Sequence, residues 1–302
     1  MLLMLATWPL WFGQSEFPRV PVFGMGAGHV AGWLLAGLCC AIVAQTARRR
    51  RTNAWLRGLT LLAGLLAVDH NLQRLQPWHW LFLLWLLLSL ISSERRVLFR
   101  TTLATVYLFA SLSRLGPDIA GGMTAQVLHA ARSSIGLQGV LAEQSQFLLC
   151  AAMTGLEFSI GLGLLFARTR KFAWVCAVLM HATLLWLLGP AGLNHQPAVL
   201  TWNAMFLIAV PLLSWTPSVS SAFEATPKTD SSRRTLAVQI GLFAFPTLGL
   251  LSWFDNWPAW QLYSPRPDVV RVFITPQSLE GLPKASQAFV GDSVLILSLI
   301  HI

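Results

Sequence analysis

Eight apolar stretches of roughly bilayer length run through this chain of 302 residues. A hydrocarbon core about 30 Å thick needs about 20 apolar residues of a helix that crosses it. The stretches lie at residues 25–46, 55–71, 77–93, 100–115, 146–167, 172–189, 199–216 and 235–254. The pattern predicts an all-α polytopic membrane protein, built as a bundle of about eight transmembrane helices.

The composition supports this class of protein. Apolar residues make up 55% of the chain and charged residues only 11%, whereas a soluble domain carries about a quarter charged residues. The net charge of +9 could indicate a nucleic-acid partner. Such a partner needs a basic face with aromatic platforms on a soluble surface, and no segment of this sequence has that character. We therefore expect a lipid bilayer, and no nucleic acid, as partner.

Most of the basic residues fall on every second connection between the apolar stretches. They follow the first, third, fifth and seventh stretches, at 48–51 with Arg57, at 95–100, at 168–171 and at 228–234. Cytoplasmic loops carry an excess of lysine and arginine. The sequence thus predicts a multi-pass protein of the cell inner (cytoplasmic) membrane, with both termini and the loops 116–145 and 190–198 outside.

The two ends of the chain differ from the bundle predicted at 25–254. Residues 1–24 begin with an apolar run too short to cross a bilayer, which we interpret as an interfacial segment or as the remnant of an earlier span. Residues 255–302 contain two expected strands, near 269–274 and 293–300, and form a short extracytoplasmic β-rich tail. One hairpin rarely folds alone. Either this tail packs on the outer face of the bundle, or the chain is a fragment of a longer protein.

Polar residues inside or at the ends of the spans mark a candidate site, because such residues are costly in lipid and usually face the bundle interior. With the topology above, they cluster in the outer half of the membrane or just beyond it. The spacing of Tyr107, Ser111 and Arg114, four and then three positions apart, puts them on one face of a helix. The candidates are Asp69, Tyr107, Ser111, Arg114, Glu157, His181, Asn194, His195, Trp202 and Asn203.

Structural interpretations compete with functional ones at several of these positions. Asp69 can pair with Arg74 or Arg114 and hold two spans together. His181 can bridge two helices, or it can serve as a general base. His79 is expected at the membrane interface. The spacing of Gly155, Ser159 and Gly163 suggests a helix–helix contact, with Glu157 pointing elsewhere. No pair of histidines has ligand spacing, so no metal is expected.

Four segments carry a family resemblance. YLFASLSRLGPDIAGGMTAQVL (107–128), DHNLQRLQPWHW (69–80) and HATLLWLLGPAGLNHQPAVLTWN (181–203) resemble parts of the bacterial HTTM (horizontally transferred transmembrane) proteins and of the vitamin K-dependent γ-glutamyl carboxylases. WPAWQLYSPRPDVVRVFI (257–274) resembles the start of their extracytoplasmic tail. The resemblance implies the same membrane architecture over most of the chain.

One position departs from that pattern. In the carboxylases a lysine ends the matching span and, once deprotonated, starts oxygenation of a quinol; here the residue is Arg114. A guanidinium keeps its proton near neutral pH and cannot act as this base. It can pair with a carboxylate or stabilise an anion. The fold can therefore carry over while glutamate carboxylation does not.

Three functions remain open at this stage. The first is an enzyme with an outward-facing polar pocket for a lipid-soluble cofactor such as a quinone. In it His181 would be the acid or base, Arg114 the anion stabiliser and Asp69 the residue that orients one of them. Tyr107 and Asn203 would add hydrogen bonds. The second is a non-catalytic protein that binds a lipid or another lipophilic small molecule. The third is a transporter-like carrier with Glu157 as a proton site, although no inverted repeat supports it.

Overall fold

The structure is a computed structural model. It describes residues 2–12, 28–48, 53–92, 94–115, 117–120, 122–137, 142–214, 230–251, 253, 258–262, 269–272 and 295–298. The chain divides into two compact units, Met1–Tyr263 and Ser264–Ile302. The predicted boundary between the helical bundle and the tail, after residue 254, lies earlier in the chain than this division. Much of the predicted tail lies outside the described residues.

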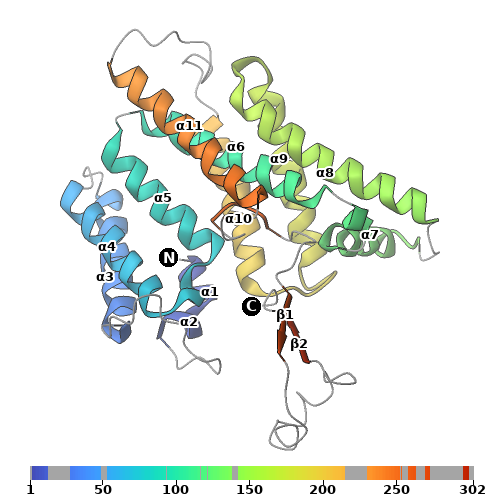
Figure 1. Cartoon of the computed structure of the whole chain (residues 1–302), viewed down its shortest axis with the longest axis horizontal. Helices are drawn as coiled ribbons and strands as arrows, with labels where there is room; N and C mark the ends of the chain where they lie inside the picture. The colour runs from blue at the N-terminus through green and yellow to red at the C-terminus, as the bar shows by residue number, and fades with distance from the viewer. Residues whose placement is uncertain are drawn as a thin grey trace, which may run out of the picture. The chain divides into compact units, whose positions relative to one another are not determined.

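The described part of the first unit is helical (Figure 1). Its elements follow the predicted spans, with short helices added before and between them. They are α1 Leu2–Ala6, α2 Trp8–Phe12, α3 Gly28–Ala47, α4 Ala54–His70, η1 Leu72–Arg74, α5 Pro77–Ile91, α6 Arg95–Arg114, η2 Pro117–Ala120, α7 Met123–Ser134, α8 Glu143–Leu165, α9 Ala167–Leu188, α10 Pro197–Ser214 and α11 Asp230–Leu250.

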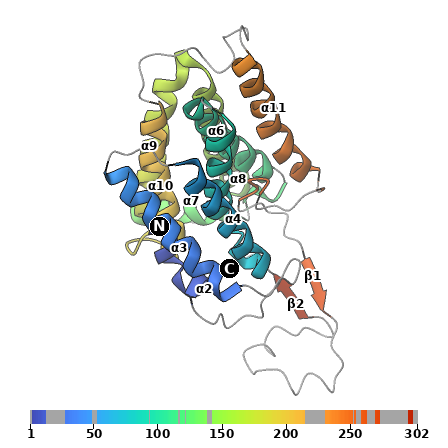
Figure 2. The ribbon, with the colours of Figure 1, turned by 90° about the vertical axis from the view of Figure 1, so that its left-hand side faces the viewer.

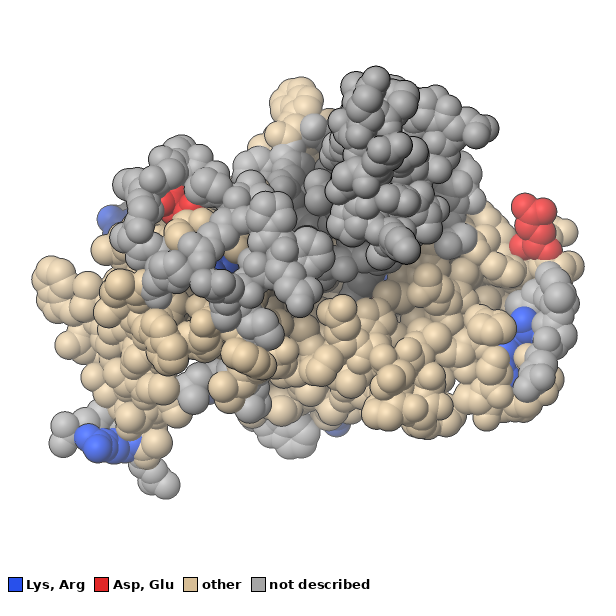
Figure 3. All heavy atoms as spheres, turned by 90° about the horizontal axis from the view of Figure 1, so that it is seen from below, with Lys and Arg blue, Asp and Glu red and all other residues tan. Residues whose placement is uncertain are grey.

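Among the described residues, four helices are long and apolar enough to cross a membrane. They are α3 (over Val30–Ala47), α8, α9 and α10, and α5 is a shorter apolar helix of 15 residues. Large apolar side chains such as Leu62, Leu179 and Ile208 stay exposed on these and neighbouring helices. Where Figure 3 shows described residues, the face is mostly tan, and most of the charged residues on it lie toward its ends. Lipid is the environment that such surfaces require. The chain is thus a helical membrane protein; the number of about eight spans stays a prediction.

Helix α6 is the centre of the bundle. It packs against α5, α8, α10 and α11, and its residues from Thr101 to Ala110 are all buried. Figures 1 and 2 show α11 running beside it. The helix begins at Arg95, earlier than the predicted span at 100–115, because its backbone continues through arginines that a search for apolar residues leaves out.

A glycine sets the close approach of α8 to α6. A Cβ atom on Gly161 would lie 2.9 Å from the Cβ of Tyr107 and 3.0 Å from the carbonyl oxygen of Ala104. The predicted contact stripe is only partly right. Gly163 does meet Ala173 of α9, but Gly155 has open space around it and Ser159 is exposed.

The N-terminal helices pack against the start of the bundle. Trp11 is 2% exposed, and the Arg74 guanidinium donates to the carbonyl oxygens of Leu10 (3.0 Å) and Trp11 (3.4 Å). His79 is 0% exposed and packs edge-on against Trp11, with 4.8 Å between the ring centroids. Burial among protein side chains does not fix the depth of a residue in a membrane, so the position of His79 at the membrane interface stays a prediction. Whether residues 1–24 lie at the interface stays a prediction.

The second unit contains two described strands, β1 Val269–Val272 and β2 Leu295–Ser298. They pair antiparallel, with Val269 opposite Ser298 and Val272 opposite Leu295. These positions fall within the two expected strand segments. Whether this unit is a β-rich tail on the outer side of a membrane stays a prediction.

Candidate functional site

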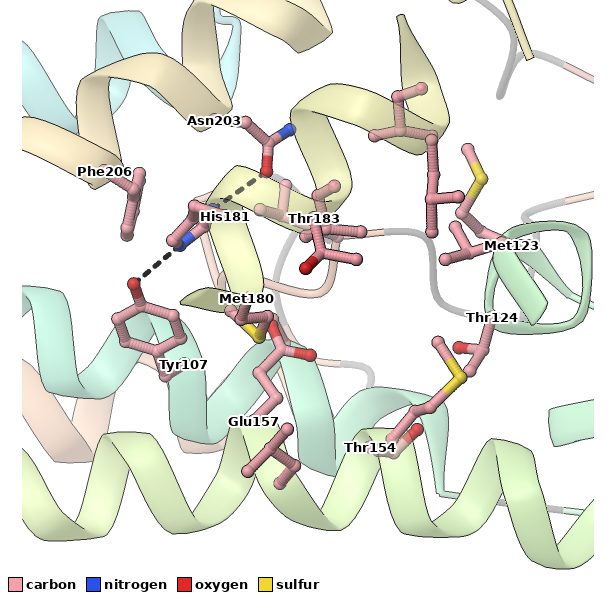
Figure 4. Close-up of a pocket in the computed structure, with 18 of the residues that line it drawn as sticks. Tyr107, Met123, Thr124, Thr154, Glu157, Met180, His181, Thr183, Asn203 and Phe206 are labelled. Atoms are coloured by element: carbon pink, nitrogen blue, oxygen red, sulfur yellow. Dashed lines mark hydrogen bonds between the residues drawn. The ribbon is translucent and has the colours of Figure 1, made fainter. Parts of the chain in front are cut away.

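A cavity of about 440 Å³ lies among α6, α7, α8, α9 and α10. This volume falls within the range of small-molecule sites, which is about 300–1,000 Å³. Its wall is mostly apolar, with Val106, Val127, Leu184 and Phe206 among the lining residues. The polar side chains on it are few. One is Arg114. The others are labelled in Figure 4: Tyr107, Thr124, Thr154, Glu157, His181, Thr183 and Asn203.

A chain of side-chain hydrogen bonds crosses one wall of this cavity. The Tyr107 hydroxyl on α6 lies 2.7 Å from Nε2 of His181 on α9. Nδ1 of the same ring lies 2.9 Å from Oδ1 of Asn203 on α10. All three side chains are buried. Phe206 packs against both rings, with centroid distances of 5.4 Å to Tyr107 and 5.2 Å to His181. Three helices are thus held together by one polar chain, drawn with dashed lines in Figure 4.

The direction of each hydrogen bond follows from Asn203. Its Nδ2 donates to the carbonyl oxygen of Val199 at 2.9 Å, so its Oδ1 faces His181 and can only accept. Nδ1 of His181 therefore carries the proton and donates it to Asn203. In the neutral imidazole, Nε2 then has a free lone pair, which accepts the hydroxyl proton of Tyr107. A ligand in the cavity would reach this basic nitrogen through the tyrosine hydroxyl.

A charged pair lies on the same cavity. Arg114, in the last turn of α6, forms a salt bridge with Glu157 of α8, and its Nε donates to the carbonyl oxygen of Ala110 at 2.8 Å. The two side chains are 16% and 17% exposed. Because the guanidinium already faces a carboxylate, the pair is close to neutral as a whole. Any anion that Arg114 stabilises must compete with Glu157 for it.

The structure brings together six of the ten predicted site residues. Tyr107, Arg114, Glu157, His181, Trp202 and Asn203 all line the cavity. Asp69 is buried on α4 and is not among the described residues that line it, so it does not meet the others there. The partner roles expected of Asp69 are held by other residues. The side-chain amide oxygen of Asn203 orients His181, and the carboxylate of Glu157 pairs with Arg114.

The other three predicted residues lie outside the described lining of the cavity. Ser111 is fully buried and donates to the carbonyl oxygen of Leu108 at 2.8 Å. Asn194 and His195 belong to the turn that ends α9: their backbone N–H groups donate to Gly189 (2.9 Å) and Leu188 (2.8 Å). They satisfy carbonyl groups that a helix end leaves unpaired. Their role in this structure is to close the helix.

One wall of the cavity was missed by the sequence analysis. Residues 116–145 were expected to form an outer loop, but they contain α7, and Met123, Thr124, Val127 and Ala131 of this helix line the cavity. Met123, Val127 and Ala131 are spaced four residues apart, which is the signal of an apolar helical face that could have indicated this wall.

No family model matches the chain, and no curated protein or solved structure matches it either.

Proposed function

We propose that this chain is a multi-pass membrane protein of the HTTM and γ-carboxylase-like type whose cavity binds a lipid-soluble cofactor such as a quinone. We place it in the cytoplasmic membrane, with the cavity toward the outer side. The observation that carries this proposal is the hydrogen-bonded chain of Tyr107, His181 and Asn203 on the wall of an otherwise apolar cavity. Glutamate carboxylation is not part of the proposal, because Arg114 stands where the base is expected.

The residues of this cavity suit a neutral aromatic head group with oxygen substituents. Phe206, Trp202 and the methionines offer apolar contact, and the Tyr107 hydroxyl offers a hydrogen bond. A quinone would supply reversible two-electron chemistry linked to proton transfer. In the protein, Tyr107 would take a proton from a ligand hydroxyl while giving its own proton to Nε2 of His181. Asn203 would stabilise the resulting imidazolium through Nδ1.

A non-catalytic binding protein is the second candidate. The observation that favours it is that the guanidinium and the imidazole on the cavity are already partnered: Arg114 by Glu157, and His181 by Tyr107 and Asn203. Such a closed network positions a ligand without offering a free base. The carrier hypothesis has Glu157 as its one argument, and pairing with Arg114 weakens it, because the carboxylate is already engaged by a partner in the protein.

The test is mass spectrometry of small molecules that co-purify with the protein in mild detergent, beside the Arg114→Ala/His181→Ala double variant. A quinone or other redox lipid bound to the wild type and lost from the variant supports the proposal. Bulk phospholipid in equal amounts on both would contradict the quinone and leave a binding protein as the better account. Uptake activity lost in Glu157→Gln, with quinone binding intact, would favour a carrier.

A further inference from the structure

We propose that the cavity opens sideways into the bilayer, between α8 and α9, and that its ligand is a membrane lipid with a compact head group and a long apolar tail. The head group occupies the cavity, and the tail leaves through this lateral opening. This inference rests on the proposed function and specifies the class of ligand and its route of entry.

The exposure of the lining residues locates the opening. Among the residues that line the cavity, Leu156 on α8 and Leu179 on α9 are 47% and 62% exposed, and Thr183, one turn after Leu179, is also exposed. The other lining residues are buried or half-buried. An opening is therefore bordered by α8 at Leu156 and by α9 at Leu179 and Thr183.

Both borders belong to helices that are long and apolar enough to cross a membrane. The exposed sides continue along each helix, through Gly155 and Leu162 on α8 and through Phe172, Val175 and Trp186 on α9. Apolar side chains exposed at this depth face lipid and not water. A ligand that passes between Leu156 and Leu179 therefore comes from the hydrocarbon region.

Helix packing limits the opening at both ends. Near the α8–α9 turn the helices touch closely, since a Cβ on Gly163 would lie 2.8 Å from the Cβ of Ala173. Beyond the cavity, α7 packs on both helices, and Met123 and Val127 close that end. The gap lies between these two contacts, at the level of Glu157 and His181.

The cavity is large enough for the head group of such a lipid but not for its tail as well. About 440 Å³ holds a substituted ring beside Tyr107, but a polyisoprenoid or acyl tail of bilayer length does not fit with it. The tail must therefore extend out of the cavity. Through the lateral gap it enters the hydrocarbon region of the bilayer, which is as apolar as the tail.

The experiment compares two probes in phosphatidylcholine vesicles containing the full chain: a dimethoxybenzoquinone without a tail, and the same ring with a polyisoprenoid tail. Leu156→Trp and Leu179→Trp fill the gap. Leu162→Trp and Val175→Trp are the matched controls, because these residues are exposed on the same helices but do not line the cavity. We expect the two gap variants to weaken binding of the tailed probe by about tenfold or more, equal to about 1.4 kcal/mol. The gap variants should weaken binding of the tail-less probe much less, because only a tail passes between Leu156 and Leu179.

Each other outcome has a definite meaning. Equal binding of the tailed probe by gap variants and controls overturns the lateral opening while leaving the proposed function standing. Equal loss of both probes also overturns it, because tryptophan would then act on the cavity itself. Failure of the wild type to bind either probe contradicts the proposed function, and the lateral opening with it.

A measurement on the wild type covers the case in which a tryptophan variant does not fold. A tailed quinone carrying a diazirine midway along the tail is photoactivated in the same vesicles, and the cross-linked peptides are sequenced. Labels on the exposed sides of α8 and α9 near Leu156 and Leu179 support the inference. Labels confined to α7 or to the turn 189–196 overturn it, because the tail would then leave toward the aqueous side.

Discussion

Two buried histidines in this protein have similar surroundings and different positions relative to the cavity. His181 is 5% exposed and His79 is 0% exposed, and each ring packs against aromatic side chains. His181 lines the cavity and bonds through both ring nitrogens to side chains of two other helices. His79 bonds through Nδ1 to the carbonyl oxygen of Arg74, 2.9 Å away, and its Nε2 has no partner among the described residues.

The difference shows what makes a buried histidine a candidate for function. His79 joins α5 to the neighbouring turn and to Trp11, and a Cβ on Gly64 would lie 3.1 Å from its Nε2, so no ligand-sized space adjoins it there. His181 can pass a proton along a hydrogen-bonded chain that reaches a cavity. Burial and hydrogen bonding are shared by both residues; access to a ligand is not.

The strongest test of this comparison replaces each histidine by alanine. His181→Ala leaves the Tyr107 hydroxyl and Asn203 Oδ1 unpaired and removes part of the cavity wall. We expect affinity for the tail-less quinone to fall about a hundredfold, the equivalent of about two lost hydrogen bonds. His79→Ala should lower the melting temperature in detergent but leave the dissociation constant within about twofold. Equal loss of affinity in both variants would remove the distinction drawn here.

The next effect concerns the charge beside the cavity. Glu157→Gln leaves the Arg114 guanidinium facing a neutral amide in an apolar surrounding. We expect a loss of about 2 kcal/mol in the free energy of unfolding, below the range for fully buried pairs because both side chains keep some exposure. Denaturant titration in detergent measures it. The Glu157→Gln/Arg114→Met double variant should recover most of the loss, and a double variant as unstable as the sum of two single losses would contradict a direct pair.

Packing of the cavity helices gives a smaller effect with a matched control on the same helix. Gly161→Ala places a methyl group against Tyr107 and the Ala104 carbonyl oxygen, and we expect about 1.5 kcal/mol of destabilisation from this overpacking. Gly155→Ala adds the same methyl group where nothing lies within 4 Å, and it should be neutral or slightly stabilising. The measurement is again denaturant titration; the reverse order of stabilities would show that α8 does not approach α6 at Gly161.

The smallest expected effect comes from one hydroxyl. Tyr107→Phe keeps the ring against Phe206 and removes the hydrogen bond to Nε2 of His181, at a cost of about 1 kcal/mol in stability. Nε2 then resembles Nε2 of His79, which has no partner among the described residues. The ¹⁵N chemical shifts of a histidine-labelled sample would show Nε2 of His181 losing its bonded proton donor. An unchanged shift would mean that Tyr107 does not donate to it.

Much of the helical framework was predictable from local sequence, and the errors have identifiable causes. Apolar runs marked the positions of α3 to α6 and α8 to α11 because spans of this kind must be apolar over bilayer length. Arg95 and Arg96 hid the start of α6, since a helix can extend beyond its apolar part. Helix α7 was taken for a loop because it is too short and too polar to register as a span, although its apolar face lines the cavity.

The residues that meet at the site could not be assigned from sequence in the same way. The sequence identified Arg114 as the departure from the resembling families and His181 as a candidate base, but it offered Asp69 as their partner. In the structure Glu157 pairs with Arg114 across 43 positions of sequence, and Asn203 meets His181 across 22. Both partners were among the candidates, but their pairing depends on helix rotation.

The amino-acid sequence thus determines the class of protein, the approximate helix positions and the candidate polar residues. Each of these depends on the free energy of moving a single side chain or a short segment into lipid. The Tyr107–His181–Asn203 chain, the Arg114–Glu157 pair, the wall formed by α7 and the gap between α8 and α9 come only from tertiary structure. Hydrogen bonds and ion pairs require a few ångströms of mutual placement between helices, and that placement is set by close contacts such as Gly161 against Tyr107.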